Sequence, residues 1–146
     1  MNMKPTTYFR LTLLFPIVLP LLIYLVDSKS WLFGVLFFSL AFGGPAYIIF
    51  AILMFIWFGK LSTSTELRKL TLKGPILFIP IQATTWIVYF YYGKLSNPEL
   101  TGGWSMLLPF AVYILILGYA YVLIADIGYS LFNKLGLING ASSLIN

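Results

Sequence analysis

The feature that most constrains this chain is a run of 28 residues, from Trp31 to Phe58, without one charged side chain. At about 1.5 Å per residue, a helix of this length measures about 42 Å, which exceeds the ~30 Å hydrocarbon core of a bilayer. A soluble domain has no place for so long an apolar helix. The run therefore predicts a membrane-embedded helix that bends, tilts strongly or lies partly at the interface.

The centre of this run carries the sequence Gly43-Gly44-Pro45. Pro45 has no N–H for the carbonyl of Ala41, and the two glycines lower helix propensity. Because each half is too short to span alone, we expect one helix that is kinked or broken at these residues, with 31–40 either spanning or lying at the interface. Exposure of an unwound backbone to a substrate, as in transporters, is the rarer alternative.

The composition extends this prediction to the whole chain. Hydrophobic residues make up 60% of it and charged residues 9%, whereas soluble domains have roughly 25% charged residues. We therefore predict an all-α membrane protein, a bundle of four transmembrane helices that forms a single integral membrane domain over residues 1–146. The expected spans are about 8–26, 31–58, 75–92 and 104–125, with a cytoplasmic loop at 59–74 and a loosely ordered tail at 127–146.

The first span contains Pro16 and Pro20, four residues apart. They share a helix face and remove the donors for the carbonyls of Thr12 and Pro16, so a bend is expected there. A basic start followed by an apolar stretch also describes a signal peptide, with Ser28 and Ser30 near a weak cleavage position. The length of the run, its prolines and the missing Ala-x-Ala pattern favour a span.

The predicted loop at 59–74 carries a capping-box pattern, Thr63-x-x-Glu66, which starts helices. A short helix should follow from Thr63 to Leu72, lie on the inner membrane surface and stop at Gly74-Pro75. Its leucines, Leu67 among them, would face the lipid. Its basic side chains would contact lipid phosphates, as in interfacial helices: Arg68, Lys69 and Lys73.

Basic residues lie mainly on one side of the predicted spans, which sets their orientation. With the N-terminus inside, seven are cytoplasmic and two are outside; the seven are Lys4, Arg10, Lys60, Arg68, Lys69, Lys73 and Lys134. Both termini are then cytoplasmic, and a bacterial cytoplasmic (inner) membrane is the expected location. Because the net charge of +5 is dispersed between apolar runs, we expect no nucleic acid partner.

Polar residues within the spans are the candidate sites. Gln82, Thr85 and Tyr89 form a stripe whose expected role is interhelical hydrogen bonding, with the lining of a substrate path as the alternative. Asp126 shares a helix face with Tyr119 and is expected at the cytoplasmic interface. If the last span began near Val112 instead, Asp126 would lie in the bilayer as a proton or cation site.

Several chemistries are excluded by residue type. The chain has no Cys and no His, which removes thiolate nucleophiles and imidazole ligands, and its four acids form no pair. We therefore expect no catalytic, cofactor or metal site. The first span also lacks the carboxylate on which small four-helix multidrug exporters rely.

Three functional hypotheses remain. The first is a non-enzymatic multi-pass protein acting through contacts with membrane proteins or lipids, of the accessory-subunit or immunity type. The alternative is a small oligomeric transporter or channel, and an enzyme is the third. The expected partners are the lipid bilayer and other membrane proteins or further copies of the chain.

Overall fold

The computed structural model describes residues 3–96 and 107–138, and this part of the chain is all-helical, as predicted. Three helical segments are long and apolar enough to cross a membrane, or up to four if a bent helix pair near the N-terminus counts as one span. The helices are α1 (Pro5–Thr12), α2 (Phe15–Asp27), α3 (Trp31–Lys60), α4 (Ser64–Ser96) and α5 (Leu107–Lys134).

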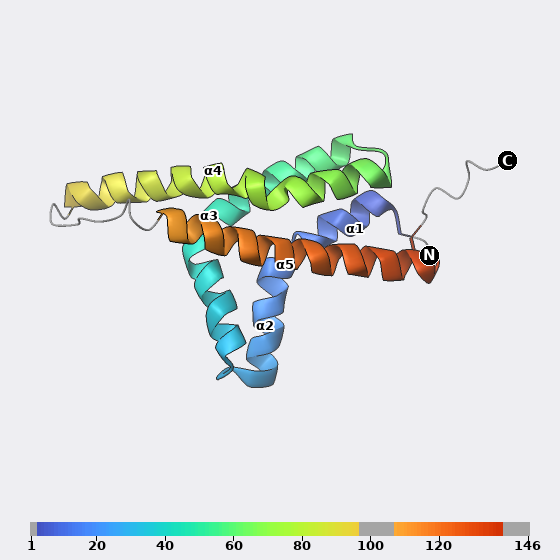
Figure 1. Ribbon diagram of the computed structural model, residues 1–146, viewed down its shortest axis with the longest axis horizontal. Helices are drawn as coiled ribbons and strands as arrows, with labels where there is room; N and C mark the ends of the chain where they lie inside the picture. Colours follow the sequence, from blue (N-terminus) through green and yellow to red (C-terminus); the bar gives the residue numbers. More distant parts are fainter. Residues whose placement is uncertain (1–2, 97–106, 139–146) are drawn as a thin grey trace.

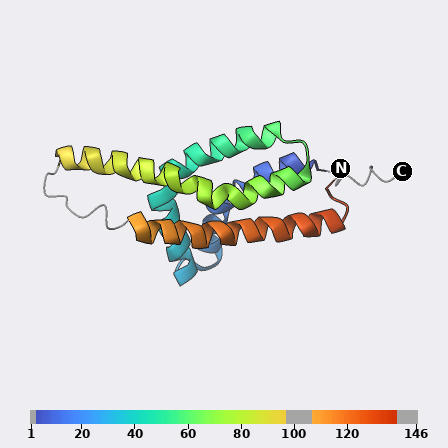
Figure 2. The same cartoon turned by 45° about the horizontal axis from the view of Figure 1, so that its top comes forward.

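The helices form an elongated bundle with one projecting hairpin (Figure 1). Helices α4 and α5 lie side by side along the long axis, and α1 and the later part of α3 pack beside them (Figure 2). Helix α2 and the first part of α3 form the hairpin, which leaves the bundle at a steep angle to α4 and α5 (Figure 1). We call this α2–α3 segment, residues 15–41, the hairpin.

The bend predicted in the first apolar run is present. Helices α1 and α2 meet at an angle of 57°, and α1 ends at Thr12, whose carbonyl would have been the partner of the missing N–H of Pro16. Pro16 itself lies in the first turn of α2, where an N–H has no intrahelical partner in any case. The break therefore falls one turn before the first proline.

Helix α3 is continuous from Trp31 to Lys60, with Pro45 inside it. The hydroxyl of Ser30 caps its start by accepting a hydrogen bond from the backbone N–H of Phe33 at 3.1 Å. The ribbon changes direction along the helix, so that its first part accompanies α2 and its later part accompanies α4 (Figure 1).

The structure corrects the prediction of a loop at 59–74 with a separate short helix. Thr63 does cap a helix, because its hydroxyl accepts a hydrogen bond from the N–H of Glu66 at 3.4 Å. That helix is α4, which continues through Gly74 and Pro75 to Ser96. Packing against α5 sustains it: the ring of Pro75 lies against Gly118 of α5, and neighbouring helices commonly compensate a proline in this way.

The prediction of a loosely ordered tail from residue 127 is also wrong for the described residues. Helix α5 passes through Asp126 and ends at Lys134, and Tyr129 is buried in the core. The N–H of Met3 donates to the carbonyl of Leu137 at 2.8 Å, which joins the two ends of the described chain. The predicted span start at 104–106 and the tail at 139–146 lie outside the described residues.

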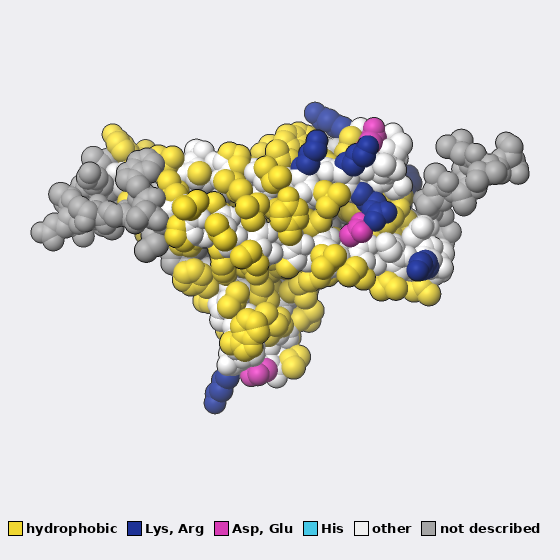
Figure 3. All heavy atoms as spheres, viewed as in Figure 1, with side chains coloured by type: hydrophobic (Ala, Val, Ile, Leu, Met, Phe, Trp, Pro, Cys, Tyr) yellow, Lys and Arg dark blue, Asp and Glu magenta, His cyan; other side chains and the backbone are white. Residues whose placement is uncertain are grey.

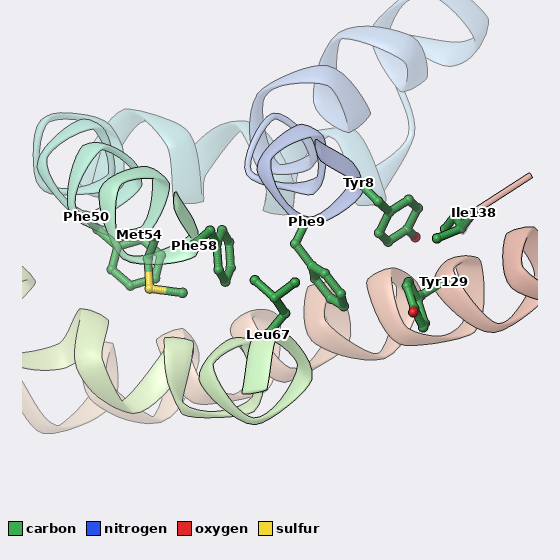
Figure 4. Close-up of a cluster of buried hydrophobic side chains, with 8 residues drawn as sticks. All are labelled: Tyr8, Phe9, Phe50, Met54, Phe58, Leu67, Tyr129 and Ile138. Carbon is green, nitrogen blue, oxygen red and sulfur yellow. The ribbon is translucent and has the colours of Figure 1, made fainter. Parts of the chain in front are cut away.

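The hydrophobic core lies at the end of the bundle where these chain ends meet (Figure 4). Leu67 is completely buried there, which contradicts the prediction that it faces lipid. The helical spacing of the leucines predicts that Leu67 lies in an apolar environment. It does not distinguish lipid from the interior of the protein, because both are apolar. The core cluster comprises Tyr8, Phe9, Phe50, Met54, Phe58, Leu67, Tyr129 and Ile138.

Candidate functional site

A bidentate ion pair connects α4 with α5. Arg68 Nε lies 2.6 Å from Asp126 Oδ1, and Arg68 Nη2 lies 2.7 Å from Asp126 Oδ2. The two side chains are 44% and 40% exposed. Arg68 was predicted to bind lipid phosphate, and its guanidinium instead holds a carboxylate in the parallel geometry typical of this pair. The neighbouring Lys69 and Lys73 are exposed.

Aromatic side chains surround this ion pair. The guanidinium carbon of Arg68 lies 5.8 Å from the ring centre of Tyr129. The hydroxyl of Tyr8 donates to the carbonyl of Ala125 at 2.8 Å, and Gly128 leaves room for that hydroxyl. The ion pair therefore belongs to the packed contact between α1, α4 and α5.

We predict that breaking the ion pair lowers the free energy of unfolding only slightly. Because both side chains are well over a third exposed, Asp126→Asn should lower the free energy of unfolding by about 1 kcal/mol or less. Unfolding of the purified protein in mixed micelles measures this. The single variant Arg68→Asp also breaks the pair and should lower the free energy of unfolding. The exchanged double variant Arg68→Asp, Asp126→Arg restores opposite charges and should be more stable than that single variant. A loss of several kcal/mol for Asp126→Asn would contradict the partly exposed pair.

A cavity of about 160 Å³ lies between the helices and is partly open to the outside. All five helices contribute to its wall, which is mostly apolar. Four glycines line it: Gly43, Gly44, Gly74 and Gly118. Among the residues singled out from the sequence, the structure brings Gly43, Gly44 and Gln82 together at this cavity.

The other members of the predicted polar stripe lie elsewhere. Gln82 is buried, but the hydroxyl of Thr85 donates to the carbonyl of Ile81 in its own helix at 2.9 Å. Tyr89 is exposed on α4, as Tyr119 is on α5. Helical spacing placed these residues on a common face, but that face meets neighbouring helices only along part of its length.

Hydroxyl groups on the cavity wall are nearly all engaged by backbone carbonyls. Tyr47 donates to Leu13 at 2.5 Å, and Tyr113 donates to Val35 at 2.7 Å. The hydroxyl of Tyr121 is buried and has no hydrogen-bond partner among the residues that the structure describes. Such a group costs about 1–3 kcal/mol when left unsatisfied. No sequence pattern singles out this position, because Tyr121 is one of several tyrosines in an apolar run.

The hairpin presents a second unusual surface. Leu25 and Trp31 are exposed, and Val26 is 88% exposed. Hydrophobic side chains cover much of the visible hairpin, with acidic and basic groups at its tip (Figure 3). At the tip, a carboxylate oxygen of Asp27 accepts a hydrogen bond from the backbone N–H of Lys29 at 3.1 Å. The hairpin is therefore an apolar projection with a charged end.

Comparison of the chain with protein-family models, curated proteins and solved structures finds no match. The hairpin, the ion pair and the cavity are therefore the features that can indicate a function.

Proposed function

We propose that this chain is a non-enzymatic multi-pass membrane protein that acts by binding another integral membrane protein, as an accessory subunit or an immunity-type protein does. The observation that carries the proposal is the hairpin, which extends from the bundle with apolar side chains exposed along it. Helix α2 packs on α3, and the rest of its surface is available to a partner.

The charged tip argues for a protein partner rather than lipid alone. If α4 and α5 cross the bilayer, a hairpin at a steep angle to them extends sideways through it. Its tip then carries Asp27 and Lys29 away from the bundle, and charged groups at membrane depth need polar partners. A neighbouring membrane protein supplies both polar partners and packing surface for helices, since helices in membranes associate mainly through close packing and hydrogen bonds.

We further propose a bacterial cytoplasmic membrane that α4 and α5 cross, with both termini in the cytoplasm and with the hairpin as a re-entrant pair in place of the first two of the four expected crossings. The contact between Met3 and Leu137 supports a common side for the two ends. Lys and Arg side chains gather at that end of the bundle (Figure 3), as expected for a cytoplasmic side. Lys69 and Lys73 would contact lipid phosphates there. We assign the change of direction in α3 to Gly43-Gly44-Pro45.

The alternative, a small oligomeric transporter or channel, has less support. A proton-coupled transporter of this sequence would rely on Asp126, the acid that a last span beginning near Val112 would place in the bilayer. Both of its carboxylate oxygens already accept hydrogen bonds from Arg68.

Photocrosslinking in native membranes tests the proposal. A photoreactive amino acid at Leu25, on the hairpin, should give a discrete adduct with one integral membrane protein. The same group at Ile116, an exposed position on α5, is the matched control and should give lipid adducts. Lipid adducts alone at both positions would overturn the proposal, and an adduct with a second copy of the chain would favour the oligomeric transporter instead.

A further inference from the structure

We propose that the cavity between the helices binds a membrane-soluble ligand of about one aromatic ring, and that Tyr121 donates a hydrogen bond to an acceptor on that ligand. This inference is independent of the proposed protein partner, because it concerns the interior of the bundle and not the hairpin.

The size and lining of the cavity set the ligand class. Its volume is about 160 Å³, and apolar cavities of about 150 Å³ stay dry and take up ligands such as benzene. Aromatic side chains from three helices line it, among them Phe50, Phe78 and Phe110. An uncharged ring is therefore favoured over an ion or a sugar.

The glycines on the cavity wall differ in the room that surrounds them. A methyl group placed at Gly44 would meet no atom within 4 Å, apart from its own helix and neighbours. In contrast, a methyl group at Gly74 would contact Phe50 at 3.6 Å. Gly44 lines the cavity and accepts a methyl group without a clash, so it is the position chosen for a larger side chain.

The hydroxyl groups set the polarity of the ligand. Those of Thr12, Ser39, Tyr47, Thr71 and Tyr113 donate to backbone carbonyls within the bundle. The hydroxyl of Tyr121 is buried without a partner among the described residues. A phenolic hydroxyl can donate one hydrogen bond, and a carbonyl or ether oxygen on the ligand would satisfy it.

Two probes of nearly equal shape test this inference: 4′-fluoroacetophenone, which has a carbonyl acceptor, and 1-ethyl-4-fluorobenzene, which has none. Fluorine NMR compares nanodiscs containing the protein with empty nanodiscs of the same lipid. We expect a protein-dependent bound signal for both probes. The acetophenone should bind at least about threefold more tightly, which is the range of one hydrogen bond.

Variants locate the binding. Tyr121→Phe keeps the ring and should abolish the preference for acetophenone while retaining the binding of the ethylbenzene. Gly44→Leu should weaken both probes, and Gly34→Leu, at an exposed glycine in the same helix that does not line the cavity, should weaken neither. Spectra identical to those of empty nanodiscs would overturn the proposal. If Tyr121→Phe still binds the acetophenone more tightly than the ethylbenzene, the assigned hydrogen bond is wrong. This outcome does not depend on whether Gly44→Leu folds.

Discussion

Replacing Phe9 by alanine should lower the free energy of unfolding by about 3–5 kcal/mol, the range measured for buried phenylalanines. Phe9 is 1% exposed. Its ring centre lies 5.2 Å from that of Tyr129 in α5 and 5.9 Å from that of Phe58 in α3. The short helix α1 would therefore lose the side chain that attaches it to both neighbours.

Reversible unfolding in mixed detergent micelles measures this loss. Leu11→Ala is the matched control, because Leu11 belongs to the same helix and is exposed. It should change the free energy of unfolding by less than about 1 kcal/mol, since apolar surface facing lipid gains little on folding in the membrane. Equal losses for the two variants would show that α1 is not anchored through Phe9.

Gly118→Ala should destabilise the protein, although alanine is the better helix former by about 1 kcal/mol. The added methyl group would lie 2.8 Å from Pro75 Cβ and 3.0 Å from Pro75 Cγ. Because the proline ring is rigid, α4 and α5 would have to separate, and overpacking of this kind costs about 1–3 kcal/mol. After the gain in helix propensity, we expect a net loss of up to about 2 kcal/mol.

The control for this variant is Gly34→Ala in α3. A methyl group there would meet nothing within 4 Å, so the intrinsic preference for alanine should leave stability unchanged or raise it slightly. The two substitutions are chemically identical and should differ in sign in the same unfolding measurement. Stabilisation by Gly118→Ala would contradict the close contact of α4 with α5.

The all-helical fold could be predicted from the sequence because long charge-free runs leave few other options. The start of α4 at Thr63 was predictable for a local reason, since a cap uses residues adjacent in sequence. The passage of α4 through Pro75 was not, because it depends on Gly118, which is distant in sequence and lies on another helix.

In the candidate sites, too, single residues could be predicted from the sequence, but contacts between helices could not. The sequence singled out Arg68 and Asp126 separately, but their sequence separation is 58 residues and no local pattern predicts their pairing. The sequence also predicted a helix kink or break at Gly43 and Gly44. Their position on the cavity wall could not be predicted, because it depends on how α4 and α5 pack against α3. Tyr121 was missed because its burial and hydrogen bonding are properties of the packed bundle.

Single-cysteine labelling tests most directly whether the bundle crosses the membrane with its basic end in the cytoplasm. The natural chain has no cysteine, so each introduced thiol is the sole target of a membrane-impermeant maleimide. Asn97→Cys, in the loop predicted to lie outside, should be labelled in intact cells. Ser64→Cys, at the start of α4, should be labelled only after the cells are opened. Labelling of Ser64→Cys in intact cells, with Asn97→Cys protected, would contradict the account.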